Sequence, residues 1–268
     1  MGIDMTPKHD NWTAKRVCEP QRKGRSNCGA CDLREVMVCS DVTVDQLADF
    51  HTWIDDMTIP SGGVVFNTDA PADGVYCIRA GIVKLVKYST SGAQRIVRIV
   101  KRGDVAGIEA VFSESFEHTA VAVGEVVACR IPVVNFRRMI EANPTLQRRL
   151  LEKSQQALRE AETWLSELAG GTAQARERMA RLLLRLREGS TNRIHRFNLE
   201  DIGAMLGITI ETASRVLADF TRLGLLTKRS AGAAMRYYNA DISGLEKIAD
   251  GGIEAATAPH SEVVRLET

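Results

Sequence analysis

Three cysteines near the N-terminus have the spacing of a metal-ligand set. Cys28 and Cys31 form a Cys-x-x-Cys motif, and Cys39 follows after seven further residues. Two thiolates at the Cys-x-x-Cys spacing can turn onto one metal ion or cluster. Three thiolates leave one position of a four-coordinate site open. The sequence offers three candidates for that position: Cys18, Cys77 and Cys129.

The residues alone do not choose between zinc and an iron–sulfur cluster at this site. Both accept four thiolates, and a thiol redox pair shares the Cys-x-x-Cys spacing. Residues 1–10 lack the apolar segment of a secretory signal. No apolar run approaches the ~20 residues that cross a bilayer. The sequence therefore predicts a cytoplasmic protein with reduced thiols and no membrane partner.

A second group of polar residues follows one face of a predicted helix over residues 210–220. The outer face near its N-terminus carries Glu211, Thr212, Ser214 and Arg215. The opposite face is apolar and is predicted to be buried: Ala213, Val216, Leu217 and Phe220. In the major groove, an arginine can bind guanine with two hydrogen bonds, and a glutamate can accept one from cytosine. This face predicts a helix that recognises double-stranded DNA.

The elements that position this face form a helix-turn-helix. A shorter apolar-spaced helix precedes it and ends at Gly207, a residue type that tolerates the left-handed backbone of a helix end. Thr209 fits the N-cap of the second helix. Residues 171–240 hold twelve Lys and Arg against six Asp and Glu, although the whole chain carries a net charge of only +1. Such a basic module suits binding to phosphates.

The middle of the chain has the pattern of a β-structure. From Ile59 to Ile131, short apolar runs alternate with glycines, which is typical of an all-β sandwich or roll. The predicted strands are Val64–Phe66, Val75–Ile78, Ile82–Tyr88, Arg95–Val100 and Val121–Ile131. Before them, residues 1–27 are predicted to be irregular, and a helix is predicted to start at Asp41 or Thr43 and to include Ile54.

A long helical pattern follows Pro132 and contains a heptad repeat. Leu151, Leu158 and Leu165 recur every seven residues, and Ser154, Ala161 and Leu168 repeat with the same period between them. This is the seam of a short coiled coil with several small core residues, which predicts a marginally stable homodimer. A helix that packs on its own domain is the alternative.

The predicted fold class is α+β, with an N-terminal β-roll, a long dimerisation helix and a C-terminal winged helix-turn-helix. The predicted wing is a hairpin over residues 227–238 with Gly232 at its turn. The predicted parts are a cysteine segment (1–40), the β-roll (41–143), the helix (144–169), the DNA-binding domain (170–245) and a flexible tail (246–268). Gly170-Gly171 is the predicted hinge before the DNA-binding domain.

In this order of parts the chain resembles the CRP/FNR regulator superfamily over roughly residues 28–245, where the β-roll is a cyclic-nucleotide-binding-like domain. The FNR branch carries Glu-x-x-Ser-Arg on its recognition helix, which corresponds here to Glu211, Ser214 and Arg215. This resemblance implies an FNR-type palindrome with TTGAT half-sites. Cyclic-nucleotide binders have Glu after the glycine of their phosphate loop and an Arg-Ser pair further along. This chain has Ile108 and His118-Thr119 there, so no cAMP binding is expected.

The resemblance also implies a cofactor. FNR proteins hold an oxygen-labile [4Fe–4S] cluster on three N-terminal cysteines and a fourth in a Cys-x-Ile-Pro motif. Cys129-Arg-Ile-Pro132 resembles that motif, so the implied ligands are Cys28, Cys31, Cys39 and Cys129. The gap between Cys31 and Cys39 is longer than in the enteric form and resembles alphaproteobacterial FnrN/FnrL-type oxygen-responsive regulators.

The function implied is a transcription regulator, mostly an activator, of anaerobic or microaerobic genes. A regulator with structural zinc or a thiol redox switch is the alternative. In the family, RNA polymerase is contacted through surface loops of the β-roll, for which residues 84–94 are the candidate region. An enzyme is not expected, because the sequence shows no Ser-His-Asp, paired-carboxylate or phosphate-loop constellation and its five histidines are scattered.

Overall fold

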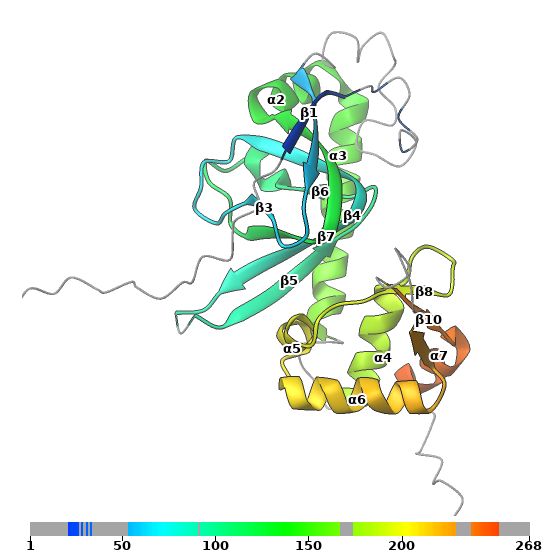
Figure 1. Cartoon of the computed structure of the whole chain (residues 1–268). Helices are drawn as coiled ribbons and strands as arrows, with labels where there is room; N and C mark the ends of the chain where they lie inside the picture. Colours follow the sequence, from blue (N-terminus) through cyan, green and yellow to red (C-terminus); the bar gives the residue numbers. More distant parts are fainter. Residues whose placement is uncertain are drawn as a thin grey trace, which may run out of the picture. The chain divides into compact units, whose positions relative to one another are not determined.

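The computed structural model describes residues 21–26, 28, 31, 33, 53–90, 92–166, 174–228 and 237–251 (Figure 1). They form two compact units, one mainly of residues up to 153 and one mainly of residues from 154 onward. Some predictions fall outside the described residues: Cys18, Cys39, the start of the helix at Asp41 or Thr43, Leu168, Gly170-Gly171 and Gly232.

The N-terminal unit is built on an antiparallel sheet with the order β1-β2-β7-β4-β5, while β3 pairs with β7 and β6 pairs with β4 (Figure 1). Its strands are β1 (Gln21–Arg25), β2 (Asp55–Ile59), β3 (Val64–Phe66), β4 (Gly74–Tyr88), β5 (Gln94–Val100), β6 (Val105–Ala106) and β7 (Thr119–Pro132). Its fully buried side chains include Ile59, Ile78, Ile96, Phe116 and Phe136. The predicted β-roll is confirmed.

Three details of the sheet differ from the prediction. Residues 75–88 form one strand, because Gly81 (φ 85°) lies within an irregular stretch of β4 instead of ending the strand. Strand β1 lies where residues 1–27 were predicted to be irregular. Strand β2 begins at Asp55, directly after the predicted helix. Both strands were missed because strand pairing uses backbone groups, which polar sequences such as Gln21–Arg25 also supply.

Three helical elements follow or interrupt these strands. A short 3₁₀ helix, η3 (Ile108–Val111), precedes β7, and α2 (Val133–Ala142) and α3 (Pro144–Trp164) follow it. In the first turns of α3, the side chains of Leu146 and Leu150 are buried. Further along α3, Leu151 and Leu158 stay exposed, as does Leu165 just after it. No helix among the described residues combines the length and the apolar character that a membrane span requires.

The described part of the second unit contains a small sheet and, after α3, four helices. The helices are α4 (Ala175–Arg185), α5 (Leu199–Leu206), α6 (Ile210–Arg222) and α7 (Ile242–Ala249). The strands β8 (Arg193–His195), β9 (Leu226–Lys228) and β10 (Tyr237–Ala240) form a sheet in the order β8-β10-β9. Antiparallel pairing of β9 with β10 places the two arms of the predicted wing side by side.

Two elements of this unit were not predicted. Strand β8 is only three residues long, which is too short to show a strand period. Helix α7 continues through the predicted boundary at residue 245, so residues 246–249 do not belong to a flexible tail. Leu245 and Ile248 are buried, and α7 packs on α4. Burial against a partner helix stabilises an eight-residue helix that would be marginal alone.

Candidate nucleic-acid interface and sulfur site

The turn between α5 and α6 is fixed by local backbone chemistry. Gly207 adopts a left-handed conformation (φ 63°) and its N–H donates to the Gly203 carbonyl, which ends α5. The Thr209 hydroxyl accepts the Thr212 N–H at 3.2 Å and caps α6. Arg178 of α4 donates from Nη1 to the Leu206 carbonyl at 2.8 Å, so the turn is also held from a third helix. These contacts confirm the predicted helix boundary and cap.

Helix α6 presents the predicted polar residues to solvent. Glu211, Ser214 and Arg215 are exposed, whereas Thr212 is half-buried. On the opposite face Ala213, Leu217 and Phe220 are buried. Val216 was predicted to be buried and is only half-buried. Since the buried face anchors α6 on its unit, the exposed N-terminal face is free to enter a DNA groove.

Glu211 is ionised on this surface. Its own backbone N–H and the Thr209 side chain favour the carboxylate and lower its pKa. A carboxylate can only accept hydrogen bonds, which suits contact with the amino group of cytosine.

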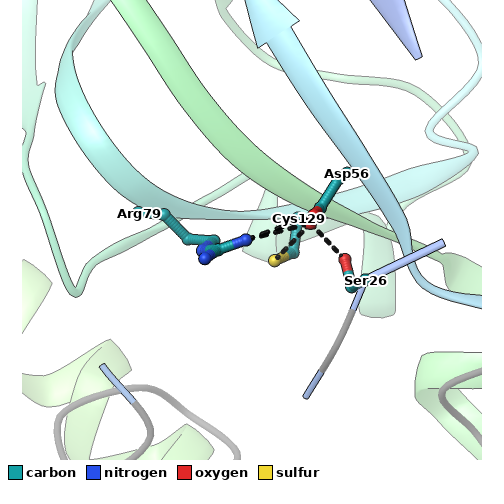
Figure 2. A network of polar contacts seen from close by, with 4 residues as sticks. All are labelled: Ser26, Asp56, Arg79 and Cys129. Atoms are coloured by element: carbon teal, nitrogen blue, oxygen red, sulfur yellow. Dashed lines mark hydrogen bonds and ion pairs between the residues drawn. The ribbon is translucent and has the colours of Figure 1, made fainter. Parts of the chain in front are cut away.

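A polar network surrounds Cys129 in the first unit, with residues from the three neighbouring strands β2, β7 and β4 and one residue that follows β1 (Figure 2). Asp56 of β2 lies directly opposite Cys129 of β7. Ser26 directly follows β1, and Arg79 lies on β4. Between Ile78 and Ala80 the β4–β7 register shifts, so Arg79 is the extra residue of a β-bulge. The sheet order β1-β2-β7-β4 therefore brings together residues far apart in sequence.

Asp56 is the centre of this network. It accepts hydrogen bonds from the Ser26 hydroxyl at 2.5 Å and from Arg79 Nη1 at 3.1 Å to Oδ1 and 3.3 Å to Oδ2. The Cys129 thiol donates to Oδ1 at 3.6 Å. Residue spacing does not predict the proximity of Ser26, Asp56 and Arg79, because it depends on strand order. The one sequence signal is a charged residue, Arg79, between the predicted strands Val75–Ile78 and Ile82–Tyr88.

Cys129 is a protonated thiol at neutral pH. Burial raises its pKa to about 12. The hydrogen bond with Ser26 and the charge of Arg79 lower the pKa, whereas the negative charges of Asp56 and Cys28 raise it further. A metal ion that binds this sulfur must therefore displace its proton.

Two other cysteines of the predicted ligand set act electrostatically on this network. Cys28 is close enough to raise the pKa of Cys129, and Cys31 is close enough to act on Arg79. Cys77 lies directly opposite Cys129 on β4 and is buried. The four described cysteines form no disulfide. In the described part of the chain, no three His, Cys, Asp or Glu residues are grouped closely enough to hold a metal ion.

The segment that corresponds to a cyclic-nucleotide phosphate loop places a histidine beside a carboxylate. His118 Nδ1 lies 3.7 Å from Glu109 Oε1, and both side chains are about four-fifths buried. Burial alone would raise the pKa of Glu109. Its pKa is nevertheless lowered, because His118, its own backbone N–H and the charge of Arg98 stabilise the carboxylate more than burial destabilises it. The loop therefore carries a carboxylate.

Comparison with known proteins agrees with this architecture. Residues 57–143 match the cyclic nucleotide-binding domain family, and residues 177–248 match the Crp-like helix-turn-helix domain family. Nitrogen fixation regulation protein FixK of Bradyrhizobium diazoefficiens is 29% identical over 215 residues, covering 78% of this chain and 89% of FixK. Transcriptional activator protein anr of Pseudomonas aeruginosa is 24% identical over 211 residues, covering 76% of this chain and 86% of anr.

A solved structure extends the likeness to three dimensions. The structure of FixK2 from Bradyrhizobium japonicum superposes with a TM-score of 0.64 at 25% identity and covers 76% of this chain and 99% of FixK2. A β-roll of the cyclic nucleotide-binding type joined to a Crp-like helix-turn-helix defines a class of DNA-binding transcription regulators, not of enzymes. This chain belongs to the CRP/FNR family of those regulators.

Proposed function

We propose that this chain is a cytoplasmic homodimeric regulator of anaerobic or microaerobic genes, mostly an activator, whose DNA binding depends on a [4Fe–4S] cluster. The ligands proposed are Cys28, Cys31, Cys39 and Cys129. The observation that carries the proposal is the buried thiol of Cys129 on β7, whose pKa is raised in part by the charge of Cys28 from the N-terminal cysteine segment. Two relatives, from Haemophilus influenzae and Pasteurella multocida, are named anaerobic regulatory protein.

The residues present suit such a group. The proposed ligands are thiols, which iron–sulfur clusters require, and Arg79 supplies a positive charge near Cys129. Arg79 Nε is buried and has no hydrogen-bond partner within the described residues, although a buried donor normally has one. A bound cluster would supply an oxygen-labile link between the N-terminal cysteines and strand β7.

The alternative keeps DNA binding and replaces the cluster with structural zinc or a thiol switch. The thiol form is favoured by one observation, the directly opposed and buried pair Cys77 and Cys129. Anaerobic purification followed by iron, sulfide and zinc analysis separates these candidates. Bound iron with equal sulfide supports the cluster. Colourless protein with one zinc per chain rejects it.

Dimerisation is proposed through α3. Three leucines spaced by seven residues are exposed by 69% (Leu151), 53% (Leu158) and 69% (Leu165), although leucine side chains favour burial. Pairing with a second copy would bury all three in a coiled-coil seam. A two-fold dimer would also place two α6 helices on the two TTGAT half-sites of the proposed palindrome.

The Leu158→Ala variant tests this seam. We expect the dimer dissociation constant to rise roughly ten-fold, because each protomer loses apolar contact area. Sedimentation equilibrium of cluster-loaded protein measures this change. Arg159→Ala, one position off the seam on the same helix, should leave the constant unchanged. Equal dimerisation of Leu158→Ala and wild type would contradict the proposed seam.

The proposal includes no cAMP effector. In the corresponding segment, Ile108 and His118 stand where cyclic-nucleotide binders have Glu and Arg, so a phosphate would lack its bidentate arginine partner. Residues 84–94, over the end of β4 and the turn into β5, are the proposed contact region for RNA polymerase.

The Glu109→Gln variant tests the ionised state of this loop. Because the pKa of Glu109 is lowered, its charge stabilises the fold above the ordinary value of 4.5, and this contribution is lost as the pH falls through the lowered pKa. We expect a loss of about 1 kcal/mol in unfolding free energy near pH 7 that shrinks below about pH 4. Urea unfolding across this range measures it. Glu117→Gln, an exposed neighbour, should have no effect, and a pH-independent loss would contradict the assignment.

A further inference from the structure

The proposed cluster ligand Cys129 lies beside a carboxylate. Asp56 Oδ1 accepts the thiol hydrogen bond at 3.6 Å, and that hydrogen bond ends when the thiol loses its proton to bind iron. Two negative charges then face each other on a buried part of the sheet, where repulsion is stronger than in water. An uncompensated Asp56 would therefore oppose the binding of any thiolate-held iron–sulfur group.

Arg79 is the cation that faces both groups (Figure 2). Its Nη1 contacts both carboxylate oxygens of Asp56 at 3.1 and 3.3 Å, and the β-bulge at this residue aims its side chain at the site. Its side chain is only 27% exposed. Nη1 contacts Asp56, and the buried Nε has no partner among the described residues, so Nε is a donor available to another group.

Burial does not neutralise this arginine. Burial lowers the pKa of Arg79, but the charges of Cys129, Asp56 and Cys31 outweigh it, and the net pKa is raised. Arg79 therefore faces Asp56 as a cation.

We infer that Arg79 is a positioning residue of the sulfur site, which counters the charge of Asp56 and so allows a negatively charged iron–sulfur group to bind at Cys129. This inference rests on the proposed cluster. It assigns Asp56 and Arg79 opposite effects on the same group: Asp56 weakens its retention and disfavours its reduction, and Arg79 does the reverse. Hydrogen bonds and charges around a cluster set its reduction potential in this way.

Four variants of the full-length protein test the inference after anaerobic reconstitution with iron and sulfide. Arg79→Gln should lose its visible iron–sulfur absorbance in air about ten-fold faster than wild type, the size of effect typical of residues that support metal ligands. Its reduction potential should be lower, since reduction adds negative charge. Asp56→Asn should shift the potential upward. The double variant Arg79→Gln/Asp56→Asn should return toward wild type in both measurements. Arg138→Gln, which removes an exposed cation on α2 of the same unit, is the matched control and should match wild type in both measurements.

The outcomes separate a charge effect from a folding defect. Rescue by Asp56→Asn, with potential shifts of opposite sign in the two single variants, supports the inference, since misfolding would produce neither. A double variant no better than Arg79→Gln, or an Arg79→Gln protein that matches wild type, overturns the inference and leaves the cluster proposal standing. A wild-type chain that binds no iron overturns the cluster proposal itself.

Discussion

The Cys129→Ala variant is expected to lose iron and sulfide completely while the chain still folds. The substitution removes the sulfur that is the proposed ligand from the sheet. Cys129 is only 7% exposed, so solvent has little access to take the place of the lost ligand. Removal of one small buried side chain from β7 costs about 1 kcal/mol of stability, which the large core of this unit tolerates. Metal analysis after anaerobic reconstitution and thermal unfolding of the apo form measure the two effects separately.

Cys77→Ala is the matched control for this variant. Cys77 is buried on the adjacent strand directly opposite Cys129, so its removal disturbs the same region of the sheet without removing the proposed ligand. We expect it to retain iron. Iron that persists in Cys129→Ala would instead assign the fourth ligand position to Cys77 or Cys18, and adding Cys77→Ala to that variant would distinguish the two.

The Arg215→Ala variant is expected to bind the TTGAT palindrome roughly 2–6 kcal/mol more weakly, from about 1–3 kcal/mol at each of two half-sites. Arg215 is exposed on the N-terminal half of α6, whose buried face keeps the helix in place when the side chain is removed. The loss should be largest for operators that carry guanine at the contacted position. Fluorescence anisotropy with the consensus palindrome and with guanine-substituted operators measures both the loss and its sequence dependence.

Arg222→Ala, at the C-terminal end of the same helix, is the control. Arg222 is exposed and pairs with Asp219 at 3.0 Å, so its removal should change affinity little. A loss for Arg215→Ala that is uniform across operators, with a shallower salt dependence, would show that Arg215 binds a phosphate and does not recognise a base.

Local patterns accounted for the DNA-binding face. The cap at Thr209, the stop at Gly207 and the apolar spacing of Ala213, Leu217 and Phe220 are interactions between residues close in sequence, so periodicity and capping rules predict them. The same reasoning failed for β8 and β1, whose pairing partners lie far along the chain. Elements stabilised by distant partners carry little local signal.

The sequence by itself determined the types of chemistry in this protein: thiols at metal-ligand spacing, a basic module with a recognition helix, and a heptad of leucines. Only the tertiary structure decided what surrounds Cys129. Strand order placed Asp56 and Arg79 beside it, and a single-residue bulge aimed Arg79 at the carboxylate. The physical reason is that a helix face follows from residue spacing along one segment, whereas contacts across a sheet depend on the register of strands that sequence spacing does not encode.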